Sequence, residues 1–176
     1  MSEPAWIALM DNTDSGMNLS ITEHSQNERM KRLVLVGSVT HDLARKTIVL
    51  GGELEICASE EGLDRLARES GMIEGKWLVY CSPDKVNDVW RIVASSMIRG
   101  ELGFCIKVST ARKVASDHMV CVYTKNYFDL EDVMRVRKKL RELGFTNRLF
   151  YKPDIYTRLN IYSNSFSDFA EHRYSG

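Results

Sequence analysis

Apolar and polar residues alternate with a period of two in several parts of the chain, and this pattern predicts β-strands. The clearest case is residues 104–109, FCIKVS, where Phe104, Ile106 and Val108 alternate with polar or small residues. Further strand-like runs are RLVLVGSV from Arg32, KTIVL and ELEICA from Lys46, GKWLVYCS from Gly75, HMVCVYTK from His118, and RLFYKPDIYTRLNIY over residues 148–162. Gly51-Gly52 predicts a turn between the second and third of these strands.

Three segments have helical patterns instead. Residues 59–71 begin with the N-cap residue Ser59 and end at Gly71, and residues 129–144 begin with the N-cap residue Asp129 and end at Gly144. Apolar residues at helical spacing follow Pro83 and continue to about Gly100. A predicted hairpin separates the two longer helices. The sequence therefore predicts an α+β fold, a largely antiparallel sheet with helices on one face.

The length of 176 residues is sufficient for one domain with a substantial core. We expect a partly mobile N-terminal segment over residues 1–31, a single α+β domain over residues 32–163, and a loose C-terminal tail over residues 164–176. No run is as apolar as a membrane helix, and the N-terminus does not resemble a signal peptide. These features favour a cytoplasmic protein with no membrane partner, and they leave the nucleus open as an additional location.

The chain lacks the motifs of common enzyme and metal sites. The four cysteines, Cys57, Cys81, Cys105 and Cys121, form no CxxC pair and each lies in a strand-like run, as expected for small buried residues. No paired-histidine motif, GxSxG or P-loop occurs. We therefore expect no catalytic residue, metal or cofactor.

One face of the predicted sheet is a candidate binding surface. Lys107 and Ser109 share a strand face, and the next strand places Tyr123 on one face with Met119 and Cys121. If this surface is open, lysine and hydroxyl groups suit a phosphate, and tyrosine suits a base. The candidate ligand-binding residues are Lys107, Ser109, Thr110, Tyr123, Lys125, Lys152 and Asp154. The alternative is a polar sheet face in water. Lys152 and Asp154 likewise fit either ligand contacts or a local turn at Pro153.

Charge is uneven along the chain, although Lys+Arg and Asp+Glu both total 24. Residues 125–158 contain nine Lys or Arg and five Asp or Glu, whereas residues 53–74 contain two and seven. A neutral chain does not bind nucleic acid through bulk charge, so such binding needs a local patch. Most of this basic excess lies on the predicted helix over residues 129–144, whose charged side is either a solvated surface or a phosphate-contact surface.

Several motifs, in order along residues 60–163, carry a family resemblance. They are GKW (75–77), VW (89–90), GxLG (100–103), KVST (107–110), VCVYT (120–124), EDVMRVRKKLRELG (131–144) and YKPDIYT (151–157). Together they resemble the basophilic-leukaemia-expressed protein family. The resemblance implies the fold of the mRNA cap-binding translation initiation factor 4E, a curved antiparallel sheet backed by helices on one face.

Cap binders hold the methylated guanine between two tryptophans, and this sequence departs from their pattern. It contains no Trp-Glu dipeptide, and we expect Trp77 and Trp90 to lie in the core. Ser109 occupies the place of a strand-ending arginine, Lys113 corresponds to a loop lysine, and Tyr123 lies near a tryptophan position. The resemblance therefore implies the fold more strongly than cap recognition.

Three functions remain open at this stage. The first is a non-catalytic binding protein that recognises a nucleotide or single-stranded RNA on the concave sheet face. The second is a protein-protein interaction domain with a protein partner. The third is an enzyme acting on a phosphorylated substrate through Lys107, Lys152 and Asp154.

Overall fold

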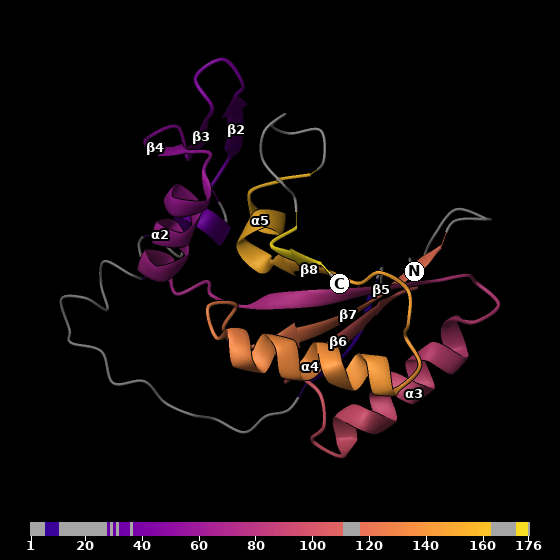
Figure 1. Cartoon of the computed structure of the whole chain (residues 1–176). Coiled ribbons are helices and arrows are strands. Elements are labelled where there is room, and N and C mark those ends of the chain that lie inside the picture. The colour runs from indigo at the N-terminus through magenta and orange to yellow at the C-terminus, as the bar shows by residue number, and fades with distance from the viewer. Residues whose placement is uncertain are drawn as a thin grey trace. The chain divides into compact units, whose positions relative to one another are not determined.

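The computed structural model describes most of the chain, which has two compact units (Figure 1). The described residues are 6–10, 28, 30, 32–35, 37–110, 117–162 and 172–175. The first unit comprises Met1–Thr13, Glu74–Tyr151 and Tyr174–Gly176, and the second comprises Asp14–Ile73 and Lys152–Arg173.

A six-stranded sheet with the order β1-β6-β7-β5-β8-β9 is the centre of the first unit. Its strands are β1 (Trp6–Met10), β5 (Gly75–Cys81), β6 (Cys105–Ser109), β7 (His118–Thr124), β8 (Phe150–Pro153) and β9 (Tyr174–Ser175). The pairs β1/β6, β6/β7, β7/β5 and β8/β9 are antiparallel. β1 lies in the segment expected to be partly mobile, and β9 lies in the expected tail. The prediction of an α+β fold with an antiparallel sheet is confirmed.

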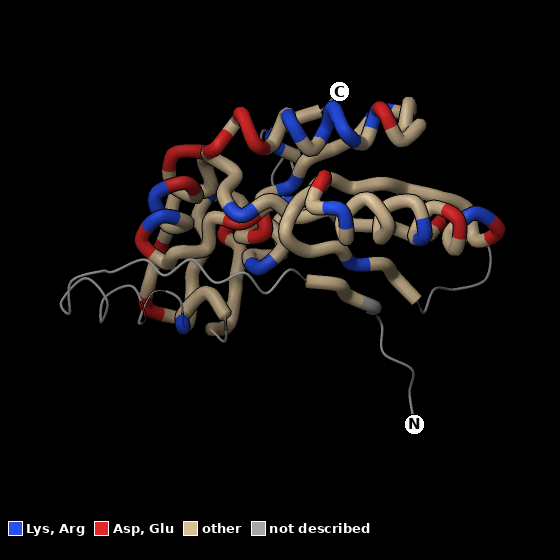
Figure 2. Tube along the Cα trace, turned by 90° about the horizontal axis from the view of Figure 1, so that it is seen from below, with Lys and Arg blue, Asp and Glu red and all other residues tan. Residues whose placement is uncertain are grey.

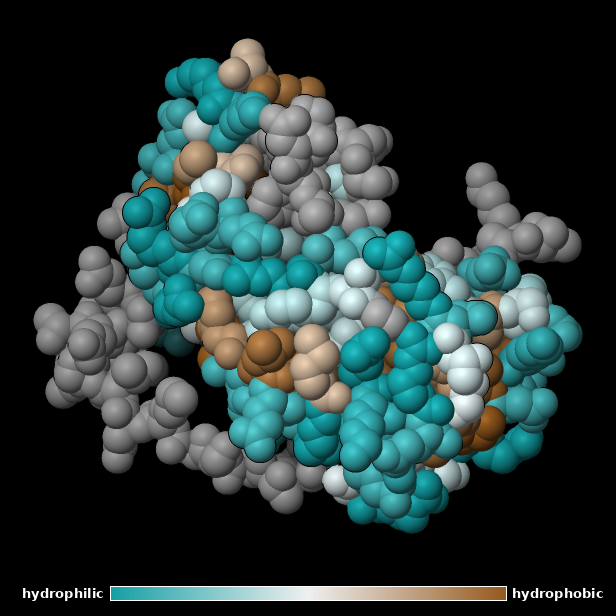
Figure 3. All heavy atoms as spheres, viewed as in Figure 1, coloured by the Kyte–Doolittle hydropathy of each residue, from teal (hydrophilic) through white to brown (hydrophobic). Residues whose placement is uncertain are grey.

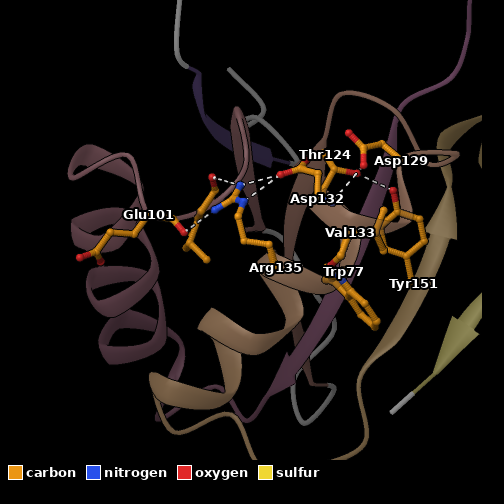
Figure 4. A network of polar contacts seen from close by, with 9 residues as sticks. Trp77, Glu101, Thr124, Asp129, Asp132, Val133, Arg135 and Tyr151 are labelled. Carbon is orange, nitrogen blue, oxygen red and sulfur yellow. Dashed lines mark hydrogen bonds and ion pairs between the residues drawn. The ribbon is translucent and has the colours of Figure 1, made fainter.

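Two helices, α3 (Val86–Ile98) and α4 (Leu130–Glu142), lie on one face of this sheet (Figure 1). Trp77, Val122 and Ile106 are direct cross-strand neighbours, and each is fully buried. The Trp77 indole Nε1 donates to the Val133 carbonyl of α4 over 2.9 Å (Figure 4). Because this row is buried beneath the helices, the alternate residues of the same strands point to the opposite face.

Helix α4 is held at its start by polar contacts (Figure 4). The Asp129 carboxylate accepts from the Asp132 backbone amide over 3.1 Å, as an N-cap does. The Arg135 guanidinium donates to the Asp132 carboxylate and to the carbonyls of Glu101 and Leu102, at 3.1 and 3.2 Å. These contacts connect α4 to the turn that follows α3. Figure 2 shows acidic residues at the start of α4 and basic residues further along it.

The described residues of the second unit form a three-stranded antiparallel sheet and helices. Its elements are β2 (Val39–Asp42), β3 (Thr47–Leu50), β4 (Leu54–Cys57), α2 (Glu60–Ser70) and α5 (Asp154–Arg158). Ser59 caps α2 by accepting from the Gly62 amide, and Gly71 ends it with a φ of 68°, as predicted. The Arg173 guanidinium donates to both Asp64 carboxylate oxygens, at 3.1 and 2.9 Å. This bidentate pair fixes Arg173 against α2.

One predicted strand is wrong over most of its length, and another is too long. Residues 32–35 are helical, and the strand begins only at Val39. Leu33, Val34 and Leu35 form a short apolar run that fits either element, and the Gly37 amide donates to the Leu33 carbonyl as in a helical turn. Likewise, the run over residues 148–162 is a strand only to Pro153. Pro153 has no amide hydrogen with which to extend the sheet, and α5 begins at the next residue.

Tyr151 provides a test of packing in the first unit. Its hydroxyl is 2.5 Å from the Thr124 hydroxyl, and its ring occupies the space left open by Gly75. We expect Tyr151→Phe to lower the free energy of unfolding by about 1–3 kcal/mol, because the buried Thr124 hydroxyl loses its partner. Urea denaturation measures this change. Tyr162→Phe, at an exposed tyrosine, is the control, and equal effects of the two substitutions would contradict the assignment.

Candidate functional site

The sheet face opposite α3 and α4 carries two lysines, and we call it the lysine face. It is formed by alternate residues of three neighbouring strands: Lys76, Leu78 and Tyr80 of β5, Met119, Cys121 and Tyr123 of β7, and Cys105, Lys107 and Ser109 of β6. Cross-strand partners share a face of a sheet. The register therefore places Lys107 beside Cys121, and Tyr123 between Lys76 and Cys105.

Two ammonium groups lie near a single aromatic ring on this face. Lys107 Nζ is 4.8 Å from the centroid of the Tyr123 ring, and Lys76 Nζ is 5.2 Å from it. Lys107 is half-buried, whereas Lys76 and Tyr123 are only 6% and 7% exposed. Cations within about 6 Å of a ring centroid are attracted by its negative face. The Tyr123 ring thus stabilises both positive charges, and two of the residues expected at the site, Lys107 and Tyr123, do lie together.

An apolar cluster lies between these polar groups. Leu78, Cys105, Cys121 and Tyr123 are buried together, and Phe104 and Met119 pack against them. Phe104 was expected on the face of Ile106, but its ring contacts Tyr123 edge-on at 6.4 Å. The alternation starts only at Cys105, because Phe104 lies before β6, where its amide donates to the Tyr123 carbonyl. The cluster gives the lysine face a packed base.

Ser109 holds the end of the β6–β7 pair. Its hydroxyl accepts from the Met119 amide over 3.0 Å, and its carbonyl accepts from His118 Nδ1 over 2.7 Å. The residue is 4% exposed. These bonds use Ser109 inside the sheet, so its direct role is to position the strands.

The other expected residues of the first unit are more widely spaced. Thr110 is half-buried and directly follows β6, and Lys125 is exposed and directly follows β7. Because the two strands are antiparallel, these residues lie at opposite ends of the pair. Lys113 lies outside the described residues.

The division between the two units falls within β8, after Tyr151, so Lys152 and Asp154 belong to the second unit, and both are buried. Lys152 Nζ donates to the Ile161 carbonyl over 2.7 Å and lies 4.2 Å from the centroid of the Tyr162 ring. The Asp154 carboxylate is 3.5 Å from the Arg158 guanidinium, one turn further along α5. These contacts lie within the unit itself and organise the segment around α5.

Lys76 and Tyr80 are members of the lysine face that the sequence analysis did not identify. Lys76 lies between Gly75 and Trp77, so its side chain points away from the Trp77 side of the sheet. The alternation of GKWLVYC was visible, and it separates Lys76 and Tyr80 from the core residues. The pairing of β5 with β7 was not visible, and only this pairing places Lys76 next to Tyr123.

Cysteines and the residue types that bind metals are the remaining reactive groups in the part of the chain that the structure describes. No group of three His, Cys, Asp or Glu residues there is suited to a metal ion. Cys81, Cys105 and Cys121 are buried as expected, but Cys57 is exposed because it points outward from β4. Burial, with the Asp117 and Asp84 carboxylates, raises the pKa of the Cys81 thiol and disfavours the nucleophilic thiolate. None of the described helices is long and apolar enough to cross a bilayer.

Fold and site together define an α+β protein whose sheet has helices on one face and paired lysines on the other. The family model of the basophilic leukemia-expressed protein Bles03 matches residues 17–160. The chain belongs to this family, and the expected membership is confirmed.

Solved structures of eIF4E are similar to this chain, as expected. One is schistosome eIF4E complexed with m7GpppA and 4E-BP, with 12% identity, a TM-score of 0.45, and coverage of 58% of both chains. The match thus spans less than two thirds of that chain. Another is Ascaris suum eIF4E-3 with m2,2,7G cap, with 15% identity, a TM-score of 0.44, and coverage of 73% of this chain and 67% of that one. A third is C. elegans eIF4E-3 with the 4E-binding protein Mextli and a cap analog, with 15% identity, a TM-score of 0.43, and coverage of 63% and 62%. The likeness concerns the fold, and no residue role follows from it.

On the lysine face, stability measurements distinguish residues that hold the strands in place from residues that can contact a ligand. We expect Lys107→Met to lower the free energy of unfolding by at most about 1 kcal/mol, because it removes one cation–π contact at a half-buried site. Ser109→Ala should cost about 1–3 kcal/mol, because it leaves the Met119 amide without its acceptor. Chemical denaturation of both variants tests this order, and a larger loss in Lys107→Met would contradict it.

Proposed function

We propose that this protein is a non-catalytic binding protein that recognises a phosphate-bearing nucleotide, free or within single-stranded RNA, on the lysine face. The observation that supports the proposal is the convergence of Lys76 and Lys107 on the Tyr123 ring. Lys107 thus places a positive charge beside an aromatic ring in a chain whose net charge is zero. Local charge of this kind is what anion binding by a neutral protein requires.

Lys107 is the central residue of the proposal. Within the described parts of the chain, it makes no ion pair with a carboxylate, and its ammonium group contacts the Tyr123 ring. A ring contact stabilises a cation without neutralising it. A phosphate oxygen would then form a charge-assisted hydrogen bond with the ammonium group.

The remaining expected residues have different roles in the proposal. Lys125 adds positive charge beyond the end of β7, near the Cys105 end of β6, and Ser109 positions the opposite end of the β6–β7 pair. Thr110 directly follows β6, so only a ligand that extends past the end of β6 would contact it. Lys152 and Asp154 shape the second unit and are not needed for binding on this face.

Calorimetric titration of the full chain tests the proposal. The ligands are GTP, 7-methyl-GTP and a short single-stranded RNA, each at two salt concentrations. Wild type should bind at least one of them, and Lys107→Met should bind about ten-fold more weakly, because a hydrogen bond to a charged group is lost. For the RNA, the dependence of log affinity on log salt should flatten by about 0.7 for one lost phosphate contact.

Lys138→Met is the matched control. Lys138 is an exposed lysine of α4, the helix that packs on the other face of the sheet, so this substitution should leave affinity unchanged. Equal weakening by both substitutions would show that binding depends on overall charge. Absence of binding by wild type to all three ligands would overturn the proposal.

Protein binding is the second candidate, and exposed apolar residues of α3 favour it. Ile98 is 77% exposed and Ile92 is 41% exposed. Six helical positions separate them, so they lie about 120° apart around the axis. Figure 3 also shows hydrophobic residues among hydrophilic ones on the face turned to the viewer. Single exposed apolar residues are common on protein surfaces, so this candidate has less support than nucleotide binding.

A further inference from the structure

Tyr80 is an exposed aromatic residue on the lysine face. It lies in β5, opposite Met119 of β7, and is 49% exposed. The two preceding β5 residues on the same face, Lys76 and Leu78, are buried at 6% and 4% exposure. The lysine face therefore becomes more open along β5 toward Tyr80.

The sheet register fixes the position of Tyr80 relative to Lys107. Lys107 is opposite Cys121, which is opposite Leu78, and Tyr80 lies two residues beyond Leu78. Strands are about 4.8 Å apart and rise about 3.3 Å per residue, so the Cα atoms of Tyr80 and Lys107 lie about 12 Å apart. Lysine and tyrosine side chains each span a good part of this separation. A ligand that contacts both residues therefore needs an anionic group at Lys107 and a planar aromatic group at Tyr80.

The surface between these two residues suits such a ligand. Met119 is half-buried and lies between Tyr80 and Ser109 in the same cross-strand row. A thioether side chain adapts to flat apolar surfaces and contacts aromatic rings favourably. The Ser109 hydroxyl already accepts from the Met119 amide, which fixes the backbone beneath the ligand.

We propose that Tyr80 is the base-stacking residue of the lysine face, so that a nucleotide lies across the sheet with its phosphate at Lys107 and its base on the Tyr80 ring. This inference rests on the proposed function and specifies the ligand as a nucleotide and its orientation. Stacking on one aromatic ring accepts any base, since every base has a π face. The arrangement thus gives affinity for nucleotides with little preference among bases.

Two small ligands separate the contribution of the base from that of the phosphate. GMP carries both groups, and ribose 5-phosphate carries only the sugar and the phosphate. Titration calorimetry of the full chain should show tighter binding of GMP to wild type. Tyr80→Ala should weaken GMP binding about ten-fold and leave ribose 5-phosphate unchanged, because stacking on one side chain is lost. Lys107→Met should weaken both ligands.

Tyr80→Phe is the matched control, because it keeps the ring and removes only the hydroxyl. It should bind GMP within about two-fold of wild type. Unchanged GMP affinity in Tyr80→Ala, together with a loss in Lys107→Met, would overturn the stacking role and leave the proposed function intact. Absence of binding of both ligands to wild type would overturn both. Thermal melts establish that each variant is folded, as expected for substitutions at the exposed Tyr80 and the half-buried Lys107.

Discussion

Burial of the row formed by Trp77, Val122 and Ile106 determines the arrangement of the first unit. These three residues are fully buried in adjacent strands, and the Trp77 indole is hydrogen-bonded to α4. A slip of one residue in any strand would turn its apolar residues to the other face and its polar residues into the core. The register of β5, β6 and β7 is therefore fixed by hydrophobic burial, and the positions of Lys76, Lys107 and Tyr123 follow from it.

Burying a lysine on the lysine face costs free energy, which the hydrophobic core offsets. Removing a charged group from water costs several kcal/mol, and Lys76 is 6% exposed. The negative face of the Tyr123 ring offsets part of this desolvation cost by attracting the Lys76 ammonium group. A bound phosphate would offset more of the desolvation cost than the ring does, because an opposite charge stabilises a desolvated cation most strongly. A surface of this kind gains stability from an anion, which is the physical basis of the proposed function.

Local signals in the sequence predicted most elements, and non-local pairings account for much of the rest. The caps Ser59 and Asp129 and the alternation in β5, β6 and β7 depend on residues close in sequence. The short apolar run at residues 32–35 fits helix and strand equally, so its assignment required the structure. At residues 154–158, Pro153 was recognised as a bend, but the helix after it was not. Lys76 and Tyr80 were missed because their neighbours on the lysine face come from strands about 40 residues away.

Hydrogen bonding separates two kinds of polar residue among those expected at the site. Ser109 and Lys152 donate to or accept from backbone groups close to them, so their polarity is used in holding the fold. Among the described residues, Lys107 contacts the Tyr123 ring and no carboxylate, so the energy of its charge is lowered while its N–H donors stay available to a ligand. A binding face needs both kinds, since fixed strands hold the cation in place and only an unneutralised cation attracts an anion. The substitution Lys107→Met therefore acts on binding with little effect on folding, whereas Ser109→Ala acts on folding first.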